Sequence, residues 1–197
     1  MFERMNETYK AMTECAAEAT RIAGKVPGHD LDGPTTCSEF DLRALVNHWV
    51  LYTSYGLERR ALKTPLPQEL VERDFTAAQD WPAAYAAQLT RALEAWSSPS
   101  AWEGEVPLGD GHAAPAPQIA EMIVKEMAVH GWDVARSIGE DFRIGEESAA
   151  LVLRVVEEHG DLYRQYQGFA DPVPLPASAT TFDRALASSG RDPYRRT

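Results

Sequence analysis

The sequence predicts a mostly helical protein in which long helices of similar length form a bundle. Apolar residues recur at helical spacing in five long segments, and the stretches between them are rich in glycine, proline and polar residues. The 197 residues are 44% hydrophobic and 25% charged, which is ordinary for a globular protein and excludes a disordered or fibrous chain. A chain of this length can bury about 70% of its unfolded surface. We therefore expect one all-α domain over residues 1–197.

The first third of the chain predicts two long helices. Residues 3–23 contain no glycine or proline, and their apolar residues follow a helical period. Three glycines and two prolines in residues 24–36 then predict a loop. A second helix is expected over residues 41–62, with the side chain of Ser38 or Asp41 capping its first turn.

The middle of the chain predicts one helix between two loops. Residues 63–79 are polar and contain two prolines, and Asp80 and Pro82 then begin a third helix that should continue to about Trp96. Residues 97–116 contain three glycines and three prolines, which predict a loop. A brief alternation of polar and apolar residues within this loop, residues 102–108, indicates one short strand.

The remaining sequence predicts three helices. Pro117 begins a fourth helix that ends at Ile138, because Gly139 provides a C-terminal stop. A fifth helix is expected over residues 146–166, and a short amphipathic helix over residues 181–188. The expected architecture is thus a helical bundle with extra short helices and one short strand.

The charge balance limits the classes of partner. Nineteen Lys and Arg against thirty Asp and Glu give a net charge of −11. Such a field repels phosphate backbones and anionic lipid headgroups, so neither nucleic acid nor a membrane is an expected partner. No stretch approaches about 18 consecutive apolar residues, and the first residues lack the pattern of a secretory leader. We expect a cytoplasmic protein.

The two cysteines lack the spacing and density of a disulfide framework, so Cys15 and Cys37 are expected to be reduced thiols. Cys37 lies just before the second helix, whose N-terminus could lower the pKa of the thiol and make it a nucleophile. The alternative is a thiol with no catalytic role.

A carboxylate and an imidazole lie on the apolar face of the fourth helix. A projection at about 100° per residue places Glu126 and His130 near the middle of a face shared by Ile119, Met122, Ile123, Val134 and Ser137. Burying an unpaired carboxylate costs several kcal/mol, so Glu126 requires a cation, a bound proton or strong hydrogen bonds. The spacing of Glu126 and His130 places both side chains side by side, as metal ligands on one helix of a bundle require.

His48, at the edge of the apolar face of the second helix, is the candidate for a third ligand. Two histidines and one glutamate are the donor set of a catalytic rather than a structural zinc site, because the fourth position stays open to water or substrate. The same donors suit iron, nickel or manganese. A hydrogen-bonded pair of Glu126 and His130 without metal is the alternative that the spacing leaves open.

Three blocks of the sequence resemble one protein family. Residues 35–48, TTCSEFDLRALVNH, are similar to the T-P-C-x-x-W-x-v-x-D-L-x-x-H segment of the mycothiol-dependent maleylpyruvate isomerase N-terminal family, within the DinB-like metalloprotein superfamily. Residues 126–139, EMAVHGWDVARSIG, resemble its E-x-x-x-H-G-W-D-l-A-x-a-x-G helix. Residues 190–193, GRDP, resemble the ending of an actinobacterial branch described only as metal-binding.

The resemblance implies a four-helix bundle of up-down-down-up topology, with a divalent metal, usually zinc, held by His48, Glu126 and His130. It also implies a low-molecular-weight thiol such as mycothiol as co-substrate, with a small electrophile as the other substrate. Coordination to the metal would lower the pKa of the thiol and supply a thiolate at neutral pH. The isomerase has a second, C-terminal domain for which this chain has no room, so isomerase activity on maleylpyruvate is not expected.

Three further residues each have alternative interpretations. Asp133 could orient the imidazole of His130 or pair with Arg136 at i+3. His159, on the apolar face of the fifth helix, could be a fourth ligand or a base, although a hydrogen-bonded core histidine is the more common case. Arg191 is interpreted as part of a solvated basic tail.

The sequence therefore supports three functional hypotheses. The first is a metal-dependent enzyme that transfers the sulfur of a small thiol to an electrophilic substrate. The second is a hydrolase in which water activated by the metal attacks the substrate. The third is a non-catalytic helical binding protein with a structural metal or none. Thiol dependence of turnover separates the first two hypotheses, and removal of the metal separates both from the third.

Overall fold

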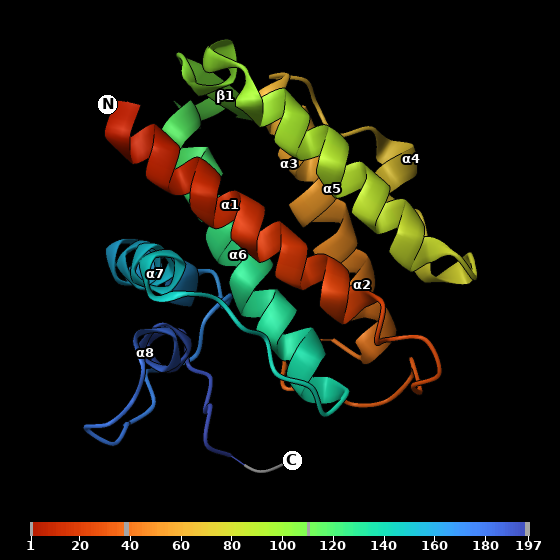
Figure 1. Ribbon diagram of the computed structural model, residues 1–197, viewed down its shortest axis with the longest axis vertical. Coiled ribbons are helices and arrows are strands. Elements are labelled where there is room, and N and C mark those ends of the chain that lie inside the picture. The colour runs from red at the N-terminus through yellow and green to blue at the C-terminus, as the bar shows by residue number, and fades with distance from the viewer. Residues whose placement is uncertain (1, 38–39, 110, 196–197) are drawn as a thin grey trace.

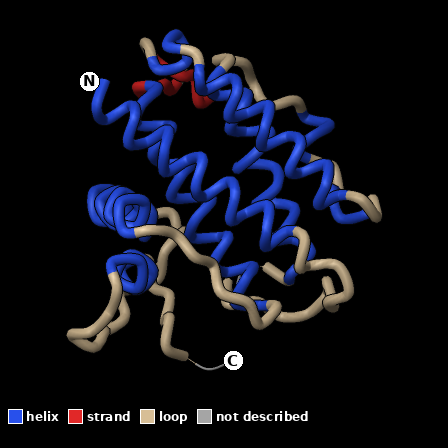
Figure 2. Tube along the Cα trace, in the orientation of Figure 1, coloured by secondary structure: helices blue, strands red, loops and turns tan. Residues whose placement is uncertain are grey.

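The computed structural model describes residues 2–37, 40–109 and 111–195 and is built mainly of helices (Figures 1 and 2). The α-helices are α1 (Phe2–Ala23), α2 (Leu42–Val50), α3 (Gly56–Ala61), α4 (Gln68–Val71), α5 (Trp81–Ser97), α6 (Ala116–Ser137), α7 (Glu146–Gln165) and α8 (Thr181–Ser188). The other elements are a π-helical turn η1 (Leu51–Tyr55), the 3-10 turns η2 (Phe75–Ala77) and η3 (Pro99–Trp102), and the strands β1 (Glu105–Gly109) and β2 (His112–Pro115). The predicted all-α class is confirmed. In the described part of the chain, no helix has the length and hydropathy needed to cross a membrane.

Four helical segments form the bundle, and their directions follow the expected up-down-down-up order (Figure 1). The first and last of these segments, α1 and α6, run in one direction, and the path α2–η1–α3 and α5 run in the other. The parallel course of the two middle segments is visible in their contacts. Thr53 bonds to Tyr85, and further along both segments Trp96 donates to the carbonyl of Leu57. The polar connection between α3 and α5, which includes α4 and η2, returns the chain to the end of the bundle where α2 begins. Helix α5 starts there.

The second predicted helix passes through a π-helical turn instead of running unbroken. Across this turn, Leu51–Tyr55, the amide of Gly56 donates to the carbonyl of Leu51, five residues back. Thr53 and Ser54 within the turn each donate a hydroxyl to the carbonyl four residues back. Such side-chain bonds compete with the regular helical pattern. The π turn is invisible to a periodicity argument, because apolar residues continue on both sides of it.

The start of α2 is held by one of the two predicted caps. The carboxylate of Asp41 accepts a hydrogen bond from the amide of Ala44, and the other candidate cap, Ser38, lies outside the described residues. Further along α2, the fully buried indole of Trp49 donates to the carbonyl of Met127 on α6 at 3.1 Å. This bond holds α2 against the middle of α6. His48, which precedes Trp49 in the chain, therefore also lies close to α6.

The loop between α5 and α6 contains two strands where the sequence predicted one. Strand β1 pairs with β2 in an antiparallel hairpin, and Gly109 and Gly111 near its tip both have positive φ angles. The second strand was missed because its sequence, HAAP, has no alternation of polar and apolar residues. The hairpin lies at the end of the bundle where α3 ends and α6 begins (Figure 1).

Helices α7 and α8 extend the bundle on one side, where α7 packs against α1 and α6, and α8 packs against α7. A buried carboxylate joins three of these helices: Glu121 of α6 accepts hydrogen bonds from Arg4 of α1 and Arg154 of α7. Burial would raise the pKa of Glu121, but the two guanidinium groups outweigh it and hold that pKa below its ordinary value. The position of α6 relative to α1 and α7 is therefore fixed by a charged contact as well as by apolar packing.

Gly131 of α6 is required by close packing and provides a test of the fold. A Cβ added at Gly131 would lie 2.3 Å from a ring carbon of the buried Phe142. We expect Gly131→Ala to lower the free energy of unfolding. The steric clash with Phe142 should cost about 1–3 kcal/mol. Alanine gains at most about 1 kcal/mol over glycine in helix propensity. Urea denaturation measures the change.

Gly160 of α7 is the matched control for this substitution. The three atoms nearest to a Cβ there all belong to the flexible end of Arg164, and the first lies at 3.0 Å. Gly160→Ala is therefore expected to leave stability unchanged or to raise it by up to about 1 kcal/mol. Equal stabilities of the two alanine variants would contradict the packing role assigned to Gly131.

Candidate metal centre

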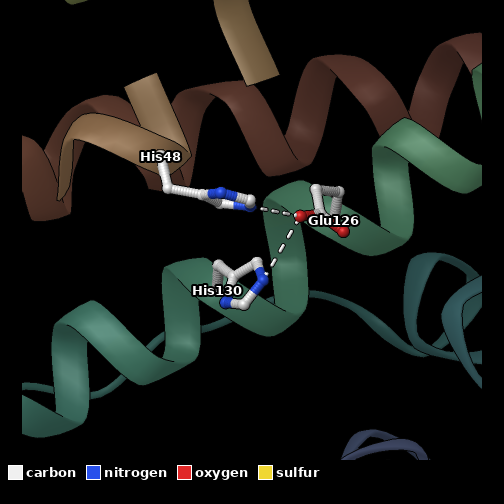
Figure 3. A group of neighbouring side chains, drawn as sticks. All are labelled: His48, Glu126 and His130. Atoms are coloured by element: carbon white, nitrogen blue, oxygen red, sulfur yellow. Dashed lines mark hydrogen bonds and ion pairs between the residues drawn. The ribbon is translucent and has the colours of Figure 1, made fainter. Parts of the chain in front are cut away.

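Three donor side chains from two helices meet beside α6. His48 comes from α2, and Glu126 and His130 come from successive turns of α6 (Figure 3). The Nε2 atoms of His48 and His130 lie 2.9 Å and 3.2 Å from Oε1 of Glu126. One ligand atom from each residue lies within 4.8 Å of the other two. The structure therefore brings together the three residues that the sequence singled out.

The donor set lies at a cleft and not in the closed core. The side chains of His48, Glu126 and His130 are 26%, 22% and 14% exposed. A cavity of about 300 Å³ opens beside His48 and Glu126, between α6 and the path α2–η1–α3. Tyr52, Ile119, Met122 and Ile123 are among its lining residues.

This placement corrects the interpretation of the apolar face of α6. The face that carries Glu126 is only partly covered, since Met122 and Ile123 are half-buried. The fully packed side of α6 is formed mainly by smaller residues, which include Ala120, Val124, Ala128, Gly131 and Ala135. A helical projection identifies apolar side chains, but it does not tell which of them a neighbouring helix covers.

The arrangement fits a divalent metal ion. A tetrahedral ion with bonds of about 2 Å holds its ligands about 3.3 Å apart, and the observed donor separations of 2.9 Å and 3.2 Å are close to this value. Two imidazole nitrogens and one carboxylate oxygen suit zinc, and also iron, nickel or manganese. The cleft next to the donors leaves room for a further ligand to approach from one side.

Lys125 is a member of the site that the sequence did not reveal. Its ammonium group, 2% exposed, lies 2.8 Å from Oε2 of Glu126 and 4.0 Å from the centre of the Tyr163 ring. Burial would raise the pKa of Glu126, but Lys125 and the two histidines reverse the effect and hold that pKa well below its ordinary value. Glu126 is therefore a carboxylate whose Oε2 is occupied by Lys125 and whose Oε1 faces both imidazoles.

A buried carboxylate orients the second imidazole of the site. Asp133, 0% exposed, lies with Oδ2 3.0 Å from Nδ1 of His130. A proton on Nδ1 donates to this carboxylate and leaves the lone pair of Nε2 directed at the donor cluster, which is the tautomer that a metal ligand needs. Burial opposes ionisation of both groups, yet Glu126 and Asp133 together raise the pKa of His130. Of the two expected partners, Asp133 therefore contacts His130, and Arg136 donates to the carbonyl of Arg195.

Arg191 corrects the expectation of a solvated tail. Its side chain is only 9% exposed, and its Nη2 lies 2.8 Å from Oδ2 of Asp133. Gly190 makes this approach possible, because its φ of +86° suits glycine and an added Cβ would lie 2.6 Å from Ala170. Thr36 donates to the other oxygen of Asp133 at 2.9 Å. The only signal for Arg191 in the sequence was the GRDP resemblance, which does not by itself place the residue.

Two other candidates lie apart from the three donors. His159 is half-buried and lines a different cavity, together with Arg4, Trp102 and Glu121. Within the part of the chain that the structure describes, it belongs to no cluster of metal-binding groups. Cys37 is half-buried, and it is one of the groups that raise the pKa of Arg191. Neither residue supplies a donor to the group of His48, Glu126 and His130.

Comparison with known families assigns the chain. The family model for the mycothiol maleylpyruvate isomerase N-terminal domain matches residues 12–135. The chain belongs to this family. The matched region contains His48, Glu126, His130 and Asp133, and it ends before α7, α8 and Arg191. A search of curated proteins and a search of solved structures each found no match. The family relates the chain to mycothiol-dependent enzymes, and the bundle agrees with a DinB-like fold.

The contact between Asp133 and His130 predicts an effect on metal affinity. We expect Asp133→Asn to weaken binding of zinc about 10–100-fold, because the amide no longer favours the tautomer with a free Nε2. Competition with a chromophoric chelator measures the dissociation constant. Arg154→Gln is the control, since Arg154 binds Glu121 at a different point of α6 and should leave zinc affinity unchanged. Wild-type affinity in Asp133→Asn would contradict the orienting role.

The raised pKa of His130 predicts the pH dependence of metal binding. Below that pKa the imidazole carries a proton that the metal must displace, so affinity should fall by about tenfold per pH unit as the pH decreases. Above the pKa the imidazole is already neutral, so a further rise in pH should not change the metal affinity through His130. Because Asp133 is one cause of the raised pKa, the decline should begin at a lower pH in Asp133→Asn. A decline at the same pH in both proteins would exclude Asp133 as a cause.

Proposed function

We propose that the chain is a divalent-metal-dependent enzyme that transfers a low-molecular-weight thiol, such as mycothiol, to a small electrophile. The thiol loses its proton, its sulfur forms a bond to a carbon of the electrophile, and in a substitution the electrophile gives up its leaving group. Zinc, held by His48, Glu126 and His130, is the proposed metal. The observation that carries the proposal is the convergence of three donor atoms within 4.8 Å of one another, with His48 and Glu126 at the wall of a cleft. Membership of a family related to mycothiol-dependent enzymes supports the thiol as co-substrate.

The donor chemistry supports a catalytic site over a structural one. Structural zinc sites have four protein ligands, whereas two histidines and one glutamate leave a position for substrate. When bound, the metal lowers the pKa of a thiol and supplies a thiolate near neutral pH. Lys125 holds Oε2 of Glu126, and Asp133 holds Nδ1 of His130, so the orientation of both side chains is fixed before the metal arrives.

The cleft gives the remaining residues their roles in this proposal. Apolar side chains of α6, Ile119, Met122 and Ile123, exclude water from one wall, and Tyr52 lies against the ring of His48 at 4.7 Å between ring centres. Exclusion of water strengthens the electrostatic interactions of a charged nucleophile with the site. The electrophile is then held beside the thiolate by the same apolar wall.

Metal content is the first test of this function. Untagged protein, analysed by elemental mass spectrometry, should carry close to one divalent metal per chain, and Glu126→Gln and His130→Ala should lose it. His159→Ala is the matched control, because this half-buried histidine lies at another cavity and should leave the metal content unchanged. Circular dichroism confirms that the variants remain folded. A wild-type protein that contains no metal and cannot be loaded would overturn the proposal.

Thiol dependence is the second part of the test. Turnover of a reactive electrophile by the metal-loaded protein should require mycothiol or a related thiol, and it should disappear with the metal in Glu126→Gln. Turnover without any thiol would instead support the hydrolase hypothesis. Metal binding with no turnover of either kind would support a non-catalytic metal-binding bundle.

A further inference from the structure

The cleft extends well beyond the donor set and ends at a pair of arginines. His48, Tyr52, Gly56 and Arg60 recur at four-residue spacing along α2–η1–α3, and all of them line the cavity, as does Arg59. Eleven residues of helix between His48 and Arg59 correspond to a rise of about 16 Å. The opposite wall is α6, and Leu66 and Leu108 also contribute to the lining. One end of the cavity therefore lies against His48 and Glu126 of the donor cluster, the other end lies against the arginines, and the walls between are mainly apolar.

Two polar atoms at the arginine end are enclosed and have no hydrogen-bond partner among the residues that the structure describes. They are Nε of Arg59 and Oγ1 of Thr64, and both residues line the cavity. The two side chains are brought together by the turn that ends α3: Lys63 has a φ of 54°, and the amide of Thr64 donates to the carbonyl of Arg59 at 3.0 Å. An enclosed polar group without a partner destabilises the folded protein, because it has given up its bonds to water without replacing them. Both atoms are closed off as the side chains now lie, so a ligand in the cavity can complete their bonds only after Arg59 and Thr64 turn toward it.

The charge at this end is also not neutralised by the described residues. Most arginines outside the cleft face a carboxylate, as Arg4 does with Glu121. In the described part of the chain, no ion pair joins Arg59 or Arg60 to a carboxylate, and Arg60 donates to the carbonyl of Pro107. Burial lowers the pKa of Arg60, whereas the hydrogen bond with Glu121 raises that of Arg4. Two positive charges without a carboxylate are notable in a chain of net charge −11.

We infer that the arginine end of the cleft is a binding subsite for the carboxylate of an elongated substrate, whose apolar stem lies along α6. A carboxylate fits better than a spherical anion, because an arginine presents Nε and one terminal nitrogen as a planar fork for two oxygens. Thr64 supplies a hydroxyl donor beside that fork. The inference rests on the proposed function only for the other end of the substrate, which reaches the donor cluster. The substrate class is thus a small electrophile with a terminal carboxylate.

The inference is tested with octanoate and its neutral amide, octanamide, by calorimetry on the metal-free protein. Octanoate is expected to bind about tenfold more tightly than octanamide, because one charge-assisted hydrogen bond contributes a difference of this size. Arg59→Gln and Thr64→Val should each reduce this preference, and Arg59→Lys should restore it only in part because lysine lacks the planar fork. Arg143→Gln, at an exposed arginine of another surface, should leave the preference unchanged.

Thr64→Val separates binding from folding. Valine has the shape of threonine and lacks the enclosed hydroxyl, so the variant should unfold at a higher urea concentration than the wild type while binding octanoate less tightly. Equal affinities of octanoate and octanamide for the wild type would overturn the inference. An undiminished preference in both Arg59→Gln and Thr64→Val would also overturn it.

His130→Ala distinguishes this failure from failure of the proposed function. The variant removes a donor that lies behind His48 and Glu126, away from the arginines, and should keep the preference for octanoate, while its metal content falls. Arg59→Gln should show the reverse, with full metal content and a reduced preference. A protein that binds no metal but prefers octanoate would retain the carboxylate subsite and lose the thiol-transfer function. A protein that binds metal without preferring octanoate would lose the carboxylate subsite and retain the thiol-transfer function.

Discussion

The rest of the site depends on the hydrogen bonds and ion pairs made by the buried carboxylate of Asp133. It is fully enclosed, and it receives bonds from Thr36 before α2, from His130 on its own helix and from Arg191 after α8. Burial opposes ionisation of this group, but Arg191 and His130 reverse the effect and hold its pKa far below the ordinary value. An enclosed carboxylate would be costly if any of these donors were absent. Three segments distant in the sequence are therefore held to one position, and the orientation of His130 follows from it.

Helix α6 carries three carboxylates, of Glu121, Glu126 and Asp133, and the differences between them explain which one can bind a metal. Glu121 is paired with two arginines that join α6 to α1 and α7, and Asp133 is paired with Arg191. Neither is among the residues that line the cleft containing Glu126. Glu126 receives only one ammonium, from Lys125, and it turns its other oxygen toward two imidazoles beside a cavity. Its partners stabilise the charge and still leave an oxygen that can bind a metal.

The sequence predicted what depends on local pattern and missed what depends on distant contacts. Helical periodicity located the long helices, and an imidazole four residues after a carboxylate singled out Glu126 and His130. Lys125 was not found, because its burial beside Glu126 depends on packing against Tyr163 of α7, a contact that no spacing in the sequence reveals. Arg191 was misread as solvated for the same reason. Strand β2 was missed because its residues gain their structure only from pairing with β1.

The two ends of the cleft differ in how their polar groups are satisfied, and this difference favours an elongated substrate. At the donor end, His48, Glu126, His130 and Lys125 bond to one another, so the free protein holds their geometry at little cost. At the far end, Arg59 Nε is enclosed and has no partner within the described ranges of the chain, and the free protein bears that cost until a ligand arrives. Binding energy gained there is available to hold the substrate in position for reaction at the donor end. The apolar wall between them carries no charge that could bind a shorter anion midway, so the separation of the two ends itself selects for substrate length.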